Sequence, residues 1–165
     1  MIYKKNGKAL PKKQILAVLL KKSWYQRLVK QNAGMYKIVI DANIWIKYAR
    51  AKNIKPLLSR FIQYNFLPVV NNYLLAEIFD ALVLNKWMSA KQAMLVIQFI
   101  AKISLKTVEK AVFALSPDAE DNYLFDLAIQ NNCVFIITNE KRLLSIKLKP
   151  LPIFSGNWFI KQFPS

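Results

Sequence analysis

Short runs of apolar, often β-branched residues alternate along this chain with longer segments in which apolar residues recur at helical spacing. The short runs predict strands at residues 38–40, 66–70, 134–138 and 152–154, with a weaker extended stretch at residues 105–108. The longer segments predict helices at residues 44–50, 56–64, 73–84, 89–103, 118–131 and 141–146, with a final short helix after Ser155. Strands that alternate with helices form βαβ units, so the pattern predicts an α/β fold with a central, mostly parallel sheet of about five strands.

The first 34 residues differ from the rest of the chain in charge. They contain nine Lys or Arg and no acid, whereas residues 35–165 contain sixteen basic and nine acidic residues. Residues 14–30 predict a basic helix, which the breaker Asn32-Ala33-Gly34 would end. We therefore expect a basic, helical N-terminal extension over residues 1–34 and one α/β domain over residues 35–165.

Basic residues outnumber acidic residues by a wide margin in the whole chain. There are 25 Lys and Arg against 9 Asp and Glu, a formal net charge of +16. A surface of this charge attracts polyanions such as nucleic acid, an anionic membrane face or an acidic protein. The same charge would also follow from a general bias toward lysine, so composition alone does not decide among these partners.

Several kinds of chemistry are excluded by residues that the chain lacks. The absence of histidine excludes Ser-His-Asp and Cys-His catalysis and histidine-based zinc sites. The single cysteine, Cys133, excludes an internal disulfide and suits a reducing cytoplasm, where we expect the protein. The longest early apolar run, residues 15–20, is too short for a membrane span, which needs about 20 residues. Hydrolysis by this chain would therefore depend on carboxylates, Lys, Tyr or a hard metal ion.

Acidic residues lie close to the predicted strand ends. Asp41 follows the first strand, and Glu77 lies on the helix after the second. Asp118 and Asp121 open the helix that precedes the strand at residues 134–138, and Glu140 comes two residues after that strand. Because ligands of parallel sheets bind outside the carboxyl ends of the strands, we expect several of these carboxylates to converge.

Carboxylates gathered in one place repel each other unless one is protonated or a cation neutralises them. Hard cations such as Mg²⁺ prefer oxygen ligands, and a bound ion can activate water and stabilise the leaving oxygen of a phosphodiester. We therefore predict a metal and catalytic site formed by Asp41, Glu77, Asp121 and Glu140. Three further residues are assigned supporting positions, namely Asn43, Asp118 and Asn139.

Four segments of the chain resemble the motifs of PIN domains, in the order that this family shows. They are Ile-Val-Ile-Asp-Ala-Asn-Ile-Trp-Ile at residues 38–46, Tyr-Leu-Leu-Ala-Glu-Ile at 73–78, Asp-Ala-Glu-Asp-Asn-Tyr-Leu-Phe-Asp-Leu-Ala-Ile at 118–129, and Phe-Ile-Ile-Thr-Asn-Glu-Lys-Arg-Leu-Leu at 135–144. The resemblance covers about residues 36–162 and is closest to the PIN-family toxin components of bacterial toxin–antitoxin systems.

This resemblance implies a three-layer α/β/α fold and an endoribonuclease that depends on Mg²⁺ or Mn²⁺. It also implies RNA as the substrate and an antitoxin protein as a partner. A homodimer is a separate expectation for the assembly of the protein. The chain departs from the family pattern at two positions of the fourth motif. Glu140 stands where the family usually has Asp, and Arg142 stands where another acid often occurs. Residues 1–34 have no counterpart in the compact family domain.

Simpler roles are open for the same residues. Asp41 would cap the following helix, Glu77 would lie on a solvated face, and Asp118, Asp121 and Glu140 would be helix-start acids. The remaining acids are expected on the surface: Asp80, Glu109, Glu120 and Asp126.

Other functions are also open. The main alternative to a nuclease is a non-catalytic or weakened PIN-like protein that binds RNA or regulates. A phosphatase or receiver domain with Asp41 as the nucleophile ranks low, because Asp41-Ala42-Asn43 lacks the second Asp that a haloacid-dehalogenase-like phosphatase needs. A peripheral membrane protein that uses its basic N-terminal helix is a further alternative.

Overall fold

The computed structural model describes residues 4–5, 8–9, 34–114, 116, 118–147 and 149–165. The helix expected at residues 14–30 lies outside the described residues. Two short strands precede the domain, β1 (Lys4–Lys5) and β2 (Lys8–Ala9), and they pair antiparallel. The boundary expected after residue 34 stays a prediction.

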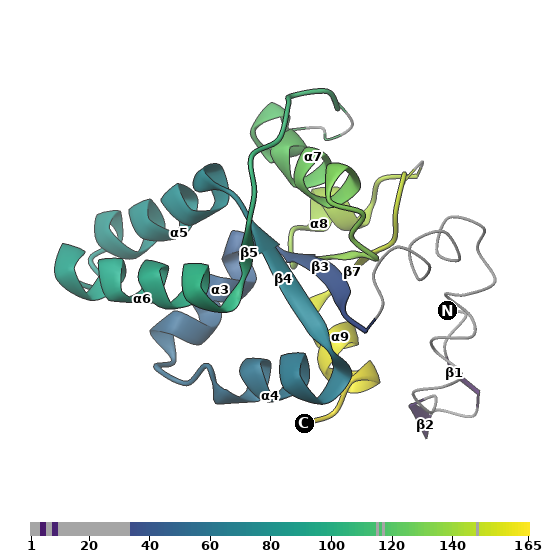
Figure 1. Ribbon diagram of the computed structural model, residues 1–165, viewed down its shortest axis with the longest axis horizontal. Helices are drawn as coiled ribbons and strands as arrows, with labels where there is room; N and C mark the ends of the chain where they lie inside the picture. Colours follow the sequence, from purple (N-terminus) through teal and green to yellow (C-terminus); the bar gives the residue numbers. More distant parts are fainter. Residues whose placement is uncertain (1–3, 6–7, 10–33, 115, 117, 148) are drawn as a thin grey trace.

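A five-stranded sheet forms the centre of the domain (Figure 1). Its strands are β3 (Tyr36–Ile40), β4 (Phe66–Val70), β5 (Leu105–Lys106), β6 (Ile136–Ile137) and β7 (Ile153–Phe154). The order across the sheet is β5-β4-β3-β6-β7, and every neighbouring pair is parallel. Strands covered on both faces need continuous apolar runs, and residues 38–40 of β3 are completely buried. The predicted parallel sheet is confirmed.

Helices cover both faces of this sheet. They are α3 (Ala42–Arg50), α4 (Lys55–Tyr64), α5 (Asn72–Leu84), α6 (Ala90–Ile103), the 3₁₀ turn η1 (Ala119–Asp121), α7 (Asn122–Gln130), α8 (Lys141–Leu144) and α9 (Gly156–Gln162). Figure 1 shows α3, α5 and α6 on one side of the sheet and α7 and α8 on the other. Helix α5 packs against α3 and α6, while α7 contacts β3 and β4. These layers are the expected α/β/α arrangement.

Two helices begin where the sequence predicts. The Ser89 hydroxyl accepts a hydrogen bond from the Gln92 amide, and the Gln92 side chain accepts one from the Ser89 amide, which completes a capping box on α6. Ser155 caps α9 by accepting from the Trp158 amide. The predicted strand at 134–138 is shorter, because only Ile136 and Ile137 pair with β3.

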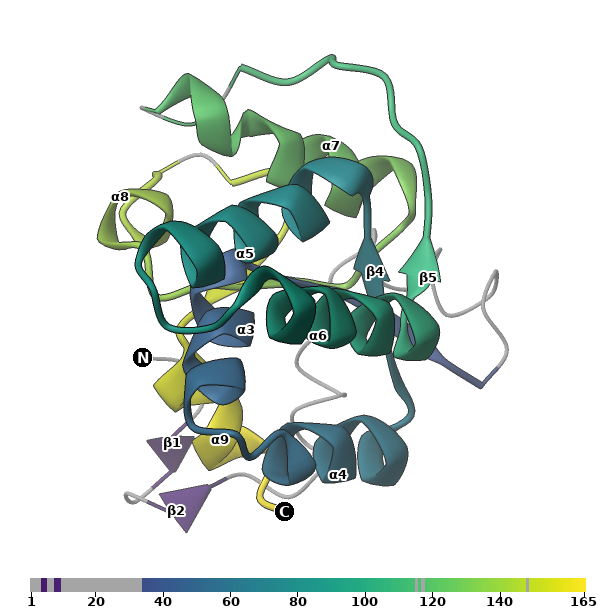
Figure 2. The same ribbon diagram turned by 90° about the vertical axis from the view of Figure 1, so that its left-hand side faces the viewer.

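An aromatic cluster closes the amino ends of the strands. It comprises Tyr64, Phe66, Phe135, Phe159 and Phe163, whose rings lie in edge-to-face, tilted or stacked pairs. Figure 2 shows the two helices that contribute to it, α4 and α9, side by side at the lower end of the molecule. The buried Arg60 ties them together by donating to the Phe163 carbonyl at 2.7 Å. Polar side chains lie at the opposite, carboxyl ends of the strands.

Candidate active site

A polar residue directly follows each of the five strands. In the order of the sheet, these residues are Thr107, Asn71, Asp41, Thr138 and Ser155. The register pairs Val39 with Ile136 and Ile40 with Ile137, so the next residues along the two strands are Asp41 and Thr138. Asp41 extends this pairing by donating its backbone N–H to the Ile137 carbonyl at 2.9 Å.

Asp41 is a buried carboxylate with two side-chain donors. Its Oδ2 accepts hydrogen bonds from the Thr138 hydroxyl at 2.5 Å and from the Asn43 amide at 2.7 Å, and the residue is only 5% exposed. Burial raises the pKa of Asp41 to about 6; the Thr138 hydrogen bond opposes this increase, while the charges of Glu77 and Asp121 add to it. Asp41 makes no side-chain cap on α3, so the simple capping role is not seen.

Glu77 reaches the same region from α5. The start of this helix is fixed by Asn71, which accepts from the Leu74 amide at 2.9 Å. The Glu77 side chain is exposed, but its Oε2 accepts a hydrogen bond of 2.5 Å from the Tyr123 hydroxyl. Burial and the nearby Glu77 charge raise the pKa of Tyr123 above its usual range, so Tyr123 keeps its proton and remains a donor.

Asp121 lies at the end of η1 and is half-buried. Its pKa is raised by burial and then by the charges of Asp118, Glu77 and Glu140, whereas Arg142 lowers it. Asp118 caps η1 by accepting from the Glu120 amide, and it forms an ion pair with Arg142 at 3.5 Å. Asp118 therefore has both the expected helix-start role and a position beside Asp121.

The fourth motif holds its own turn in place. Glu140 caps α8 by accepting from the Arg142 amide at 3.3 Å, while its own N–H donates to the Thr138 hydroxyl at 2.9 Å. Asn139 donates its N–H to the Asn43 side-chain oxygen and accepts from the Gly156 N–H. These contacts join α3, β6 and α9 around Asp41.

The structure brings three of the four expected acids close to one another. The charges of Glu77 and Asp121 raise the pKa of Asp41, and the charges of Glu77 and Glu140 raise the pKa of Asp121. Among the described residues, however, no three acidic or thiol side chains are arranged as a complete set of metal ligands. The donors that are present are carboxylate oxygens, which suit a hard cation such as Mg²⁺. Glu140 differs from the other three acids because its carboxylate caps α8.

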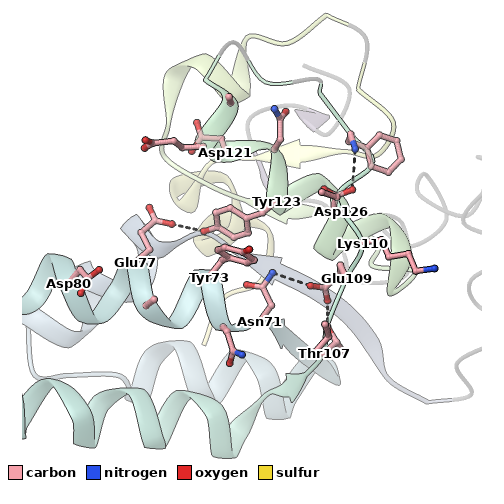
Figure 3. A pocket seen from close by; sticks show the side chains of 18 of the residues that line it. Asn71, Tyr73, Glu77, Asp80, Thr107, Glu109, Lys110, Asp121, Tyr123 and Asp126 are labelled. Carbon is pink, nitrogen blue, oxygen red and sulfur yellow. Dashed lines mark hydrogen bonds between the residues drawn. The ribbon is translucent and has the colours of Figure 1, made fainter.

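A cavity of about 980 Å³ opens beside these acids, between α5, the segment after β5 and the start of α7 (Figure 3). Six of the nine acidic residues line it, namely Glu77, Asp80, Glu109, Glu120, Asp121 and Asp126. In a chain with a net charge of +16, acidic side chains are therefore concentrated in one hollow.

Four of these acids were expected on the surface; Asp80 and Glu120 are exposed as expected, whereas the expectations for Asp126 and Glu109 were wrong. Asp126 is 5% exposed, and its Oδ1 accepts from the backbone N–H groups of Val112 and Phe113. Glu109 is half-buried and accepts from Asn71 and from two other side chains, Thr107 and Asn131. These hydrogen bonds compensate the cost of burying the two carboxylates. Through the same bonds, Asp126 and Glu109 hold the segment after β5 in place.

Two site residues were missed by the sequence analysis, Thr138 and Tyr123. Thr138 lies within the fourth motif, directly after the apolar run of its strand, and that position is the signal that identifies it. Tyr123 follows Asp121 by two residues, but no sequence spacing connects it to Glu77, which lies 46 positions earlier.

In a comparison with known protein families, one family model matches the part of the chain that contains this site. The model for the PIN domain matches residues 37–142, more than half of the chain, and the match includes all four of the expected acids. Comparison with curated proteins finds no match. In the described part of the chain, none of the helices has the length and apolar composition that a membrane crossing requires. With the parallel sheet and its acidic carboxyl edge, the family match shows that the chain belongs to the PIN domain family.

Proposed function

We propose that this protein is a cation-dependent endoribonuclease that hydrolyses phosphodiester bonds of RNA. PIN domains are generally nucleases. The observation that supports the proposal best is the buried Asp41 carboxylate, which is held by Thr138 and Asn43 and lies within the electrostatic influence of Glu77 and Asp121. Such an arrangement raises the free energy of the ionised protein unless a cation compensates it.

Asp41, Glu77 and Asp121 would hold the cation, Mg²⁺ or Mn²⁺, with Glu140 at the margin. A bound cation of this kind activates water and stabilises the leaving oxygen of a phosphodiester. The carboxylate oxygens match the ligand preference of both ions. Asp118 and Asn139 would act indirectly, through Arg142 and through Asn43.

The chain's own residues would keep the acids oriented. The Thr138 hydroxyl and the Asn43 amide both donate to Oδ2 of Asp41, which fixes the rotation of this carboxylate. The Tyr123 hydroxyl does the same for Glu77. Hydrogen bonds to an ionised carboxylate favour its charged form, which is the form that binds a cation. The excess of Lys and Arg elsewhere would attract the RNA backbone.

A cleavage assay with single-stranded RNA tests the proposal. We expect cleavage with Mg²⁺ or Mn²⁺, no cleavage in excess EDTA, and recovery when the cation is restored. Asp41→Asn should abolish the activity and keep the wild-type circular dichroism spectrum. Cleavage that persists in EDTA, or at the wild-type rate in Asp41→Asn, would contradict the proposal.

The resemblance of the four motifs to PIN-family toxins supports a more specific role. We infer that the protein is the toxin of a toxin–antitoxin module, acts in the cytoplasm and is silenced by an antitoxin protein. A small reading frame directly upstream, whose product binds this chain and restores growth on co-expression, would support this role. Its absence would favour housekeeping RNA processing. The homodimer stays a prediction that light scattering on the purified protein tests.

A second candidate is a PIN-like protein that binds RNA without cutting it. This candidate is favoured by the absence, among the described residues, of a finished three-acid group, together with the use of Glu140 as a helix cap. Calorimetric titration with Mn²⁺ separates the two functions. A nuclease should bind the ion and lose binding with Asp41→Asn, whereas a non-catalytic protein should show the same heats in both.

A further inference from the structure

The cavity beside the acidic residues extends well beyond them. Its volume of about 980 Å³ lies near the upper end of the range for ligand pockets, roughly 300–1,000 Å³. Three separate segments form its walls: the first turns of α5, residues 107–113 after β5, and the start of α7. The wall after β5 is anchored because Asp126 accepts two of its backbone N–H groups.

Two tyrosines lie side by side in this cavity. Their ring centroids are 6.2 Å apart with an interplanar angle of 30°, and Figure 3 shows the ring of Tyr73 beneath that of Tyr123. The Tyr123 hydroxyl is engaged with Glu77, so this ring has a defined position next to the acids. Tyr73 is 74% exposed and extends the aromatic surface outward from it. An exposed ring supported by a second ring is a platform on which a planar group can stack.

The charge of the cavity selects what can enter it. Six carboxylates line the walls, and Lys110 is the basic residue beside them. Three of the six, Glu77, Glu109 and Asp126, accept hydrogen bonds from other side chains or backbone groups of the protein. The others repel a phosphate group, but they can accept hydrogen bonds from amino groups. The combination therefore favours a flat, uncharged ring with N–H donors.

We propose that this cavity binds one unpaired nucleobase of the RNA, stacked on Tyr73, next to the phosphate that is cut. The inference rests on the proposed function for its substrate class and adds a base-binding subsite. Adenine, cytosine and guanine have exocyclic amino groups, whereas uracil has none, so the subsite should discriminate against uracil. Tyr73 supplies the stacking surface, the carboxylates supply the choice of base, and Tyr123 is a positioning residue that acts through Glu77.

Fluorescence of a short single-stranded RNA with one 2-aminopurine tests the subsite in the full-length protein. The titration is done in EDTA, so that binding is measured without cleavage. We expect stacking to quench the probe with wild-type protein and with Tyr73→Phe, which keeps the ring. Tyr73→Ala should weaken binding by about 5- to 150-fold, the range for loss of one stacked base. Trp87→Leu is the matched control, because Trp87 is 42% exposed and lies outside this cavity, over the Arg50 guanidinium.

Competition by unlabelled oligonucleotides then tests the choice of base. Adenine- or cytosine-containing oligonucleotides should displace the probe more strongly than the uracil-containing one. Equal affinity of Tyr73→Ala and wild type, equal competition by all bases, or no quenching by the wild type would each overturn the subsite. The cleavage assay is read separately: quenching that depends on Tyr73 without any cleavage would refute the nuclease and keep the subsite. Normal cleavage with a Tyr73→Ala variant that binds equally well would do the reverse.

Discussion

The Thr138 hydroxyl donates a hydrogen bond of 2.5 Å to Oδ2 of Asp41, and the two residues lie 97 positions apart in the sequence. The bond exists because β3 and β6 are neighbouring parallel strands that end at the same level of the sheet. Thr138 is fully buried and also accepts the Glu140 N–H, so its hydroxyl connects the first and fourth motifs.

Removing this hydroxyl should impair the proposed activity. Thr138→Val keeps the shape but leaves Asp41 without its shortest hydrogen bond, and it leaves the Glu140 N–H without this acceptor. Because the Thr138 bond lowers the pKa of Asp41, its loss should shift the acidic limb of the pH–rate profile to higher pH. We expect a rate about 10- to 100-fold lower, as for other residues that orient metal ligands. Thr138→Ser keeps the donor and should retain both rate and profile; a profile that Thr138→Val does not move would contradict this role.

Asp41→Asn should stabilise the cation-free protein at neutral pH. Folding raises the pKa of Asp41 from 3.8 to about 6, so the protonated acid favours the folded state. That contribution is fully present below pH 3.8 and is lost as pH rises through about 6. Above this value the ionised carboxylate destabilises the fold by an amount on the order of 1–3 kcal/mol, which the neutral amide avoids.

Thermal unfolding in EDTA at several pH values measures this effect. The variant should melt higher than the wild type at pH values above about 6, and the difference should shrink toward pH 4 as Asp41 becomes protonated. Adding Mn²⁺ should stabilise the wild type alone. A lower melting temperature for Asp41→Asn at neutral pH would mean that its hydrogen bonds outweigh the buried charge.

Glu140→Gln separates metal binding from helix capping. The amide oxygen of Gln can still accept from the Arg142 N–H, so α8 should form normally. Hard cations prefer an anionic oxygen, so we expect a weaker apparent affinity for Mg²⁺ and a rate that higher Mg²⁺ partly restores. Rates of both proteins against Mg²⁺ concentration provide the measurement. Superimposable curves would leave Glu140 as the cap of α8 only.

Residues 1–34 should add affinity for RNA and no chemistry, because they have nine basic residues and no acid. A truncated chain that begins at Met35 should bind RNA more weakly but cut it at a similar saturated rate. For every phosphate that the truncated chain no longer neutralises, the slope of the logarithm of the binding constant against the logarithm of salt concentration should flatten by about 0.7. An unchanged slope would indicate that this segment binds a protein or a membrane surface instead.

Asp126→Ala should loosen the segment after β5. The substitution leaves the N–H groups of Val112 and Phe113 without their acceptor, and a hydrogen bond to a charged group contributes about 1.5–3 kcal/mol. Urea denaturation should show a loss of that order. Asp80→Ala, at an exposed acid on α5, is the matched control and should change stability by about 0.5 kcal/mol or less. Equal losses in both variants would show that Asp126 does not anchor the segment.

The sequence was sufficient for the fold and for the position of Asp41 at the carboxyl edge of the sheet, but not for the hydrogen-bond partners of the acids. Apolar runs such as residues 38–40 predict buried strands, and an acid directly after such a run predicts Asp41 at the carboxyl edge. The partners of Asp41 and Glu77 depend on which strands and helices become neighbours, and one sequence does not show that pairing. The surface prediction for Asp126 failed for a different reason. Its apolar neighbours from Leu124 to Ile129 indicate a helix buried on most sides, and an acid in such a helix needs hydrogen-bond donors.

Strand β3 comes first among the five strands of the parallel sheet, yet it occupies the middle of that sheet. Chain segments that follow it therefore add to both of its sides, and the surroundings of Asp41 come from both halves, with Glu77 after β4 and Thr138 after β6. Pairings of such long sequence separation form slowly, because the intervening chain must first be ordered. After dilution from denaturant, helical content should return early. Nuclease activity should return only when both halves have packed against β3. The recovery of activity therefore measures when the sheet is complete.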